Sequence, residues 1–262
     1  DLVASGRVPV ARLVEIFRQR SDSSIVANAH RILRGEMPRF APKGEGLSDF
    51  YFVERAEPGE ALEAVLRILL ERIPEAFRLD PRTDVQVIAP MYRGEVGVDN
   101  LNRVLRDALN PSGPALESGG RLFRAGDRVI ALRNDYEKEV FNGDTGRIAA
   151  LEPERGRLFV RFADRTVGYE RGDLEDLSLA YAVSVHRAQG SEYPAVVLPL
   201  VTAHYLLLRR SVLYTAVTRA KRLVVLIGSR RALALAVRND GEVRRHSCLA
   251  ERLRFSAAAP PA

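Results

Sequence analysis

The segment Leu179–Leu200, LAYAVSVHRAQGSEYPAVVLPL, places the strongest constraint on the fold of this chain. Two apolar runs, Leu179–Val185 and Ala195–Val201, flank a polar stretch that contains a glycine. Short β-branched runs are typical of buried parallel strands, and open α/β sheets bind ligands just beyond the carboxyl ends of their strands. Position alone favours an ordinary connecting loop over a binding site, so the functional interpretation needs a second segment.

That second segment is VLYTAVTRAKR at Val212–Arg222, which precedes a further apolar run at Leu223–Ile227. Together the two segments resemble motifs V and VI of superfamily 1 helicases. The match is to the forms HKxQGSE and YTAxTRAKK of the RecD-like 5′-to-3′ DNA helicases. Arg187 and Ala188 stand where Lys and Ser are commoner in that family, so we assign no role to these two side chains.

A further resemblance lies near the start of the chain. Val8–Phe17 predicts a buried strand, and the sequence EIFRQ at its end resembles helicase motif IV. In that motif an arginine, here Arg18, reaches from the second motor domain to the γ-phosphate held by the first. Charge on a transferring phosphoryl group favours a rigid guanidinium fork. The alternative is a surface arginine that merely follows a strand.

A predicted strand at Asp84–Ala89 is followed by APMYRG, which resembles a RecD-family segment along the DNA path. Tyr92 would stack on a base and Arg93 would hold a phosphate, a combination that single-strand binders use. A packed aromatic residue in a turn explains the same sequence equally well.

The remaining pattern predicts an α/β fold in which helices alternate with strands. Predicted helices span Ser21–Gly35, Pro58–Ile73 and Val96–Leu109, with another from Arg230, and Phe50–Val53 predicts a short strand. The resemblance implies a RecA-like parallel sheet with helices on both faces. It covers essentially the whole chain.

Between about residues 122 and 169 the pattern changes to short β runs separated by turns, which predicts a small barrel. The runs are 128–133, 145–151, 157–162 and 165–169, and Asn142-Gly143-Asp144 is a hairpin signal. The resemblance implies an SH3-like β-barrel inserted into the second motor domain. We therefore expect motor-domain parts at 1–118 and 174–262 and the barrel at 119–173. The barrel residues Arg133, Asn134, Tyr136 and Lys138 fit a role facing DNA or the rest of the motor, or a plain turn and surface role, so none is assigned to binding.

The chain lacks a P-loop, because none of its lysines (Lys43, Lys138 and Lys221) stands in G-x-x-x-x-G-K-[ST]. Together with the start at Asp1-Leu2, this absence predicts the carboxyl-terminal half of a helicase motor. ATP with Mg²⁺ would be held mainly by a missing amino-terminal motor domain, and this half alone is expected to be inactive.

The resemblance implies specific roles at the nucleotide. Arg18 and Arg219 would contact the γ-phosphate, and Glu192 and the Gly190 backbone would approach the ribose or the phosphates. Glycine permits close backbone approach, and a carboxylate accepts hydrogen bonds from ribose hydroxyls. Gln189 would link the nucleotide loop to the DNA loop.

Three further side chains, Ser184, His186 and Thr215, are candidates for contacts to the DNA backbone. Hydroxyl and imidazole groups suit phosphates without reading sequence. A buried, hydrogen-bonded histidine is the alternative for His186. No metal-binding cluster is visible in the sequence.

Composition is consistent with a nucleic-acid partner. The net charge is +6 and the pI is about 9.7, which suits a phosphate-bearing ligand. No apolar run approaches the ~20 residues of a membrane span, and the single cysteine, Cys248, suits a reducing compartment, so we expect a cytoplasmic protein with no membrane partner.

Three alternatives remain beside the helicase. They are a nucleic-acid-binding module indifferent to nucleotide, a RecD-type subunit working with other subunits of a recombination nuclease complex, and the helicase portion of a conjugative relaxase. The expected partner in the helicase interpretation is single-stranded DNA. The residues themselves do not show the direction of unwinding. The family resemblance implies 5′-to-3′.

Overall fold

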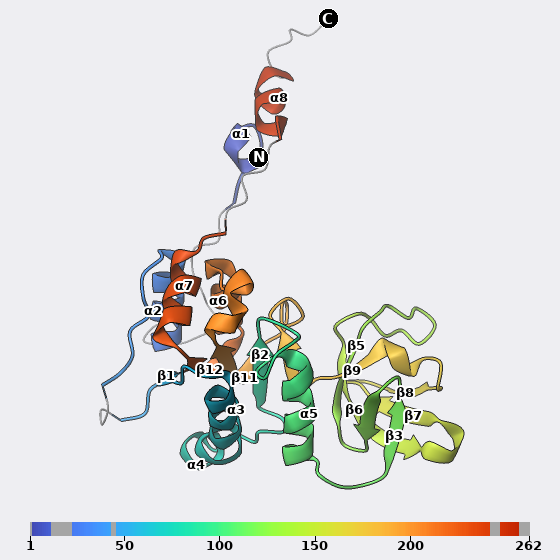
Figure 1. Ribbon diagram of the computed structural model, residues 1–262. Coiled ribbons are helices and arrows are strands. Elements are labelled where there is room, and N and C mark those ends of the chain that lie inside the picture. The colour runs from blue at the N-terminus through green and yellow to red at the C-terminus, as the bar shows by residue number, and fades with distance from the viewer. Residues whose placement is uncertain (1, 12–22, 43–45, 242–246, 257–262) are drawn as a thin grey trace, which may run out of the picture.

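The structure of the protein is a computed structural model, and the residues that it describes are 2–11, 23–42, 46–241 and 247–256. Five strands form a parallel sheet in the order β1-β12-β11-β2-β10 (Figure 1). Their bounds are β1 Phe50–Glu54, β2 Val85–Ala89, β10 Ala182–Ser184, β11 Tyr193–Leu200 and β12 Ala220–Gly228.

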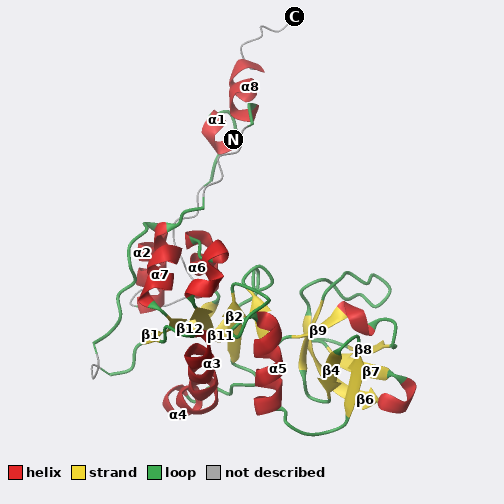
Figure 2. Ribbon diagram, viewed as in Figure 1, coloured by secondary structure: helices red, strands yellow, loops and turns green. Residues whose placement is uncertain are grey.

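Helices cover both faces of this sheet (Figures 1 and 2). One face carries α2 (Ser24–Leu33), α6 (Arg210–Val217) and α7 (Arg230–Arg238), and the other carries α3 (Pro58–Arg67), α4 (Ile73–Phe77) and α5 (Val98–Leu109). A π-helical turn, Ile68–Arg72, joins α3 to α4. Among the described residues, no helix is both long enough and apolar enough to cross a membrane.

Strand β12 shows why the sheet strands are continuously apolar. Val224 and Leu226 pack into the core under α2, α6 and α7, whereas Val225 and Ile227 pack into the core under α3, α4 and α5. Successive side chains of a strand point to opposite faces, so a sheet covered on both sides must be apolar at every position. The predicted α/β sheet with helices on both faces is confirmed.

The second part of the structure is antiparallel. Strands β3 (Ala115–Ser118) and β4 (Arg121–Arg124) form a hairpin, and a five-stranded sheet follows in the order β8-β7-β6-β5-β9. Its strands are β5 Arg128–Ala131, β6 Thr145–Glu152, β7 Arg157–Arg161, β8 Thr166–Tyr169 and β9 Leu177–Leu179, with 3₁₀ turns at Pro153–Arg155 and Leu174–Asp176. The hairpin and this sheet enclose a third core built around Phe123, Leu158 and Val160.

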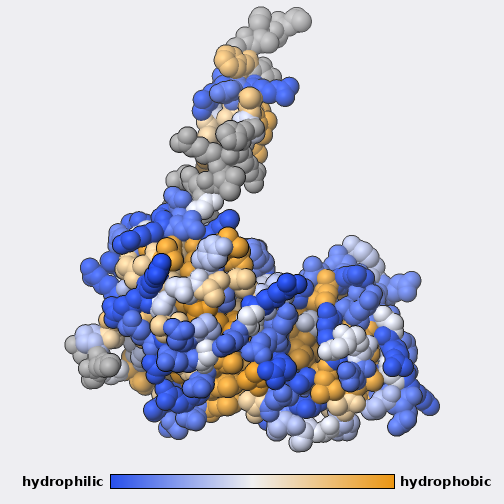
Figure 3. All heavy atoms as spheres, in the orientation of Figure 1, coloured by the Kyte–Doolittle hydropathy of each residue, from blue (hydrophilic) through white to orange (hydrophobic). Residues whose placement is uncertain are grey.

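The first and last described helices also meet. Helix α1 (Leu2–Ser5) packs against α8 (Leu249–Ser256). Arg254 donates a hydrogen bond to the Ala4 carbonyl, and Arg7 Nη2 donates to the Arg254 carbonyl at 3.3 Å. In the space-filling view, hydrophilic side chains dominate the rim of the visible face, and apolar side chains show between the helices (Figure 3).

The predicted strand over Val8–Phe17 is wrong for its described part. Residues 7–11 form no regular element, and Val8 and Val10 are 42% and 50% exposed. A strand needs a neighbour that accepts its hydrogen bonds, and in the described residues the parallel sheet ends at β1 and β10 without reaching this segment. Residues 12–17 of the predicted strand, and Arg18 after it, lie outside the described residues.

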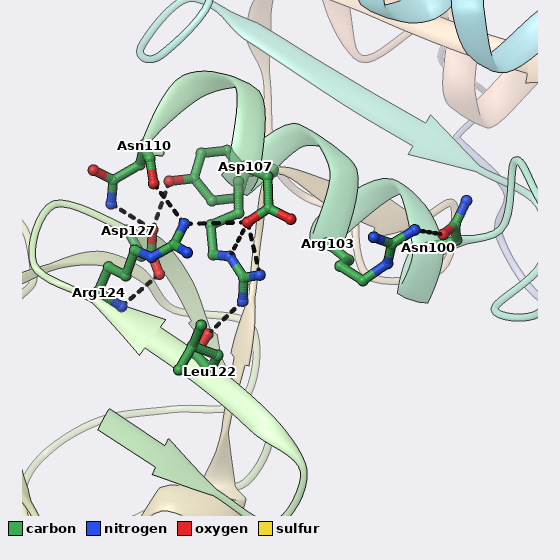
Figure 4. Close-up of polar contacts among 9 residues, drawn as sticks. Asn100, Arg103, Asp107, Asn110, Leu122, Arg124 and Asp127 are labelled. Atoms are coloured by element: carbon green, nitrogen blue, oxygen red, sulfur yellow. Dashed lines mark hydrogen bonds and ion pairs between the residues drawn. The ribbon is translucent and has the colours of Figure 1, made fainter. Parts of the chain in front are cut away.

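A buried carboxylate ties the antiparallel part to the parallel sheet (Figure 4). Asp127 is 0% exposed and accepts hydrogen bonds from Asn110 Nδ2 at 2.7 Å, the Arg124 backbone N–H at 2.7 Å and the Tyr181 hydroxyl at 2.9 Å. Burial raises the pKa of the Asp127 carboxyl above its ordinary value, and the three hydrogen bonds oppose that rise. Asn110 follows α5 and Tyr181 precedes β10, so one carboxylate joins three elements.

A second set of contacts fixes the start of β10. Arg128, on β5, donates from Nη1 to the Val85 carbonyl at 2.8 Å and from Nη2 to Gln86 Oε1 at 2.7 Å. The buried Gln86 donates in turn to the Tyr181 carbonyl at 3.0 Å. Asn102 of α5 pairs with both backbone groups of Ala182, each at 2.9 Å. These contacts position the edge strand that leads into the polar segment singled out in the sequence.

Candidate nucleotide and nucleic-acid site

The polar segment folds as a chain of tight turns after β10. The backbone N–H of Ala188 donates to the Ser184 carbonyl at 3.0 Å, and that of Ser191 donates to the Ala188 carbonyl at 3.2 Å. Ala188 is fully buried, whereas His186 and Gln189 are exposed. The alternative of a buried histidine at His186 is therefore wrong.

Gly190 has a backbone conformation that few other residues adopt. Its φ is +84°, in the left-handed region where a Cβ is unfavourable. Apart from Gly190 and its two chain neighbours, no heavy atom of the described structure lies within 4 Å of the position where a Cβ would stand. The backbone at this position thus faces open space that a ligand can approach.

Arg219 brings the two motif segments together. It follows α6, and its guanidinium donates from Nη1 to the Ser191 carbonyl at 3.2 Å and from Nε to the Thr215 carbonyl at 3.2 Å. The Tyr193 N–H also donates to the Arg219 carbonyl at 2.9 Å. Because Tyr193 pairs with Ala220, this cluster lies at the amino ends of β11 and β12.

Glu192 extends the same cluster through an ion pair. Its Oε2 lies 2.8 Å from Lys221 Nζ, and the Glu192 side chain is 27% exposed. Lys221 lies within the matched motif, but the sequence reasoning assigned it no role, because only the folded chain shows that its ammonium reaches this carboxylate. The cluster thus contains the guanidinium of Arg219, the accessible backbone of Gly190, and a negative and a positive charge from Glu192 and Lys221. These groups fit one side of a nucleotide's phosphates and ribose.

A second cluster lies at the carboxyl ends of β2 and β10. The Tyr92 hydroxyl donates to Ser184 Oγ at 3.3 Å, and the Arg187 guanidinium stands 5.7 Å from the centre of the Tyr92 ring. Ser184 is 3% exposed and Tyr92 is 43% exposed, so the serine helps to fix a ring that is open to solvent. Arg93 is exposed on the same loop.

The structure therefore groups the predicted residues into two clusters. Tyr92, Ser184 and His186 lie at the carboxyl edge of the sheet, while Thr215 lies beside Arg219, with Gln189 on the loop that joins the two clusters. Sequence reasoning missed the contact of Arg187 with Tyr92, which no spacing rule predicts, because the two residues are far apart along the chain. The binding roles of all these residues stay predictions.

Two stretches of the chain match known helicase families. Residues 101–162 match the SH3 domain of ATP-dependent RecD-like DNA helicases. Residues 179–227, which contain both motif segments, match the UvrD-like helicase C-terminal domain. The first match covers most of the antiparallel strands, and the second covers β10, β11 and nearly all of β12.

Curated relatives extend the similarity to nearly the whole chain. The chain is 34% identical over 253 residues to the ATP-dependent RecD2 DNA helicase of Deinococcus radiodurans, covering 97% of this chain and 33% of that protein. It is 32% identical over 196 residues to the RecBCD enzyme subunit RecD of Mycobacterium tuberculosis, covering 71% of this chain and 33% of that protein. The chain thus spans about a third of the length of these relatives.

Solved structures share the fold. A Pif1 helicase structure concerned with forked double-stranded DNA superposes with a TM-score of 0.52 at 17% identity, covering 94% of this chain and 55% of that chain. Bacteroides Pif1 bound to single-stranded DNA gives a TM-score of 0.51 at 15% identity, covering 95% and 57%. The predicted fold class, a RecA-like sheet that carries a small SH3-like domain, is confirmed. This chain is therefore a homologue of the RecD-like DNA helicases, with one stretch similar to their SH3 domain and another similar to the UvrD-like helicase C-terminal domain.

Proposed function

We propose that this chain is the second motor domain of an ATP-dependent DNA helicase that moves 5′-to-3′ along single-stranded DNA. The observation that carries the proposal is the 3.2 Å hydrogen bond from Arg219 Nη1 to the Ser191 carbonyl. It holds the arginine of one helicase motif against the loop of the other, in a chain homologous to RecD-like helicases. The open Gly190 backbone and the Glu192 side chain lie next to that contact along the chain.

In this proposal the chain completes an ATP site whose main contacts come from another domain. ATP with Mg²⁺ would be held mainly by an amino-terminal motor domain with a P-loop, and it would supply the phosphoryl group that is hydrolysed. Arg219, together with Arg18, would donate to the γ-phosphate oxygens, where a guanidinium fork stabilises spreading negative charge. Glu192 would accept from the ribose hydroxyls, and Gly190 would allow close backbone approach.

Coupling to DNA follows from the same arginines. While a γ-phosphate is present, their hydrogen bonds to it would stabilise the closed state of the cleft. After hydrolysis they would lose that ligand. A ligand shifts a conformational equilibrium only through its different affinity for the two states. Gln189 lies on the loop between the two clusters, so it is our candidate for transmitting closure to the strand.

The DNA strand would lie over the carboxyl-edge cluster. Tyr92 would stack on a base, and Arg93, Ser184 and His186 would contact the backbone. Thr215, beside Arg219, would contact the backbone where the strand nears the nucleotide side. We propose that an inserted barrel lies between two parts of the motor domain, at residues 119–173 but extended by β3, which pairs with β4, and by β9, which pairs with β5. We also propose that the protein works in the cytoplasm.

A second candidate keeps the same motor in a larger assembly. The chain is 32% identical to the mycobacterial RecBCD enzyme subunit RecD over 71% of its length. That similarity favours a subunit that works beside other motors of a recombination nuclease. The two candidates differ in whether the intact protein unwinds DNA by itself.

The test uses the intact natural protein and two duplexes that differ only in the polarity of their single-stranded tail. With ATP and Mg²⁺ present, we expect the duplex with a 5′ tail to be separated and the duplex with a 3′ tail to remain paired. A gel assay with a labelled strand measures both. Separation of the 3′-tailed duplex alone would contradict the proposed direction. ATP hydrolysis on DNA without separation of either duplex would favour the subunit of an assembly.

A further inference from the structure

A 3₁₀ turn after β11, Thr202–Leu207, presents two large apolar side chains to solvent. Tyr205 is 64% exposed and Leu206 is 62% exposed, and they are neighbours in the chain. Neither residue belongs to a motif considered so far. Single exposed apolar residues are common on protein surfaces, so the place of this pair in the fold has to carry its interpretation.

The turn leaves the parallel sheet at the same edge as the loop that carries Tyr92. Strands β11 and β2 are parallel neighbours, and Val197 pairs with Val87. Parallel neighbours that are level at this pair leave the sheet at the same edge, so the turn after β11 and the loop after β2 both lie at the carboxyl edge. Tyr205 is therefore a second exposed aromatic side chain at the carboxyl edge.

Buried residues within and just after this turn fix its backbone. His204 is 2% exposed, and its backbone N–H donates to the Val201 carbonyl at 3.0 Å. Burial lowers the pKa of the His204 imidazole to about 4, so the ring is neutral near pH 7. Leu208 is also buried, and its carbonyl accepts from Asn239 Nδ2 at 3.0 Å. A ring on a fixed turn loses little conformational entropy when it binds a ligand.

The charge around the turn suits a phosphate-bearing strand. Between residues 202 and 211 the chain contains two arginines, Arg209 and Arg210, and no aspartate or glutamate. Arg209, two residues after the turn, is exposed. Aromatic side chains that stack on bases, set among cations that follow the backbone, are the usual features of single-strand binding surfaces. The same features disfavour a basic protein partner, which these arginines would repel.

We propose that Tyr205, flanked by Leu206, is a stacking platform for one base of the single strand, beside the base that would lie on Tyr92. The platform holds the strand without reading its sequence, because every base has a face that can stack. This inference rests on the proposed function and adds a binding residue to it.

The test measures the affinity of the intact protein for a fluorescein-labelled oligo(dT) without nucleotide. Tyr205→Ala should raise the Kd by roughly 5- to 100-fold, the range for loss of one aromatic–base stack. Tyr205→Phe keeps the ring and should bind nearly as well as the wild type. Leu206→Ala serves as the matched neighbour and should change the Kd less than Tyr205→Ala. ATP hydrolysis without DNA and the Tm should be unchanged in all three variants, because both side chains are exposed.

The outcomes separate this inference from the function on which it rests. If the wild type binds the oligonucleotide and Tyr205→Ala binds it equally well, the platform is overturned and the proposed function stands. If Tyr205→Phe loses as much affinity as Tyr205→Ala, the hydroxyl acts and stacking is overturned. A lower Tm in Tyr205→Ala with unchanged DNA affinity would assign the ring to a contact within the protein instead. Failure of the wild type to bind overturns both proposals.

Discussion

Replacement of Arg219 by alanine is expected to lower the kcat for ATP hydrolysis of the intact protein by roughly a thousand-fold or more. That factor corresponds to about 4 kcal/mol of transition-state stabilisation. The reason is that Arg219 is proposed to donate to phosphoryl oxygens whose charge develops mainly in the transition state. Affinity for ATP should change far less, because most ground-state contacts would come from the P-loop domain. Steady-state kinetics with saturating single-stranded DNA measures kcat, and a fluorescent nucleotide titration measures binding.

Two further variants separate catalysis from a structural effect. Arg219 also donates to the Ser191 and Thr215 carbonyls, so its loss could disturb the loop. Arg219→Lys keeps the positive charge but loses the paired donors of the guanidinium, so its kcat should lie between those of the wild type and Arg219→Ala. Arg230→Ala removes an arginine that is 74% exposed and paired only at the surface with Glu54, so its kcat should match the wild type. Undiminished hydrolysis by Arg219→Ala would contradict the assignment.

Replacement of Asp127 by alanine is expected to cause the largest loss of stability. The change leaves three donors without their acceptor, namely Asn110 Nδ2, the Arg124 N–H and the Tyr181 hydroxyl. Each unsatisfied buried donor costs about 1–3 kcal/mol, so the total loss should be roughly 3 kcal/mol or more. That loss corresponds to a fall in Tm of about 6–12 °C for a domain of this size. Scanning calorimetry of the intact protein measures it.

The control for this prediction is an exposed carboxylate on the same part of the chain. Asp164 is 70% exposed and lies 3.2 Å from Arg165 Nε, and Asp164→Ala should leave the Tm almost unchanged. Asp127→Asn retains the shape of the side chain but can present an acceptor to only some of the three donors. Its Tm should therefore lie between those of the wild type and Asp127→Ala. Equal Tm values for Asp127→Ala and the wild type would show that this network does not hold the two parts together.

The pH dependence of the Asp127 contribution has a defined sign. Burial raises the pKa of the folded carboxyl above the unfolded value of about 4. The folded protein therefore holds this proton to higher pH than the unfolded protein does. The titration of Asp127 favours the folded state most below the unfolded pKa, and this contribution is lost as pH rises through the folded pKa. At neutral pH, the three hydrogen bonds offset part of the cost of the buried charge.

Much of the fold could be predicted because its signals are local. Helix α2 begins after Ser23, whose side chain accepts from the Ile25 N–H, and Gly35, which has a positive φ, follows its end. The apolar runs of β11 and β12 are buried on both faces, as parallel strands require. The motif segments were found for a similar reason, because each is a continuous stretch of sequence.

The rest depends on contacts that sequence periodicity does not contain. The alternation of Val8 and Val10 resembles a strand, but the described sheet offers it no neighbour. The ion pair of Glu192 with Lys221 and the approach of Arg187 to Tyr92 join segments that only the strand order brings together. Tyr205 carries no motif, and its exposure is visible only after the chain is folded.

ATP hydrolysis by the intact natural protein, measured with and without single-stranded DNA, tests the central claim most directly. If this chain is the second half of a translocating motor, DNA must favour the closed arrangement in which its arginines reach the nucleotide. We therefore predict strong stimulation of hydrolysis by single-stranded DNA. Hydrolysis that is absent in both conditions, or equal in both, would contradict the motor and leave a nucleic-acid-binding module in its place.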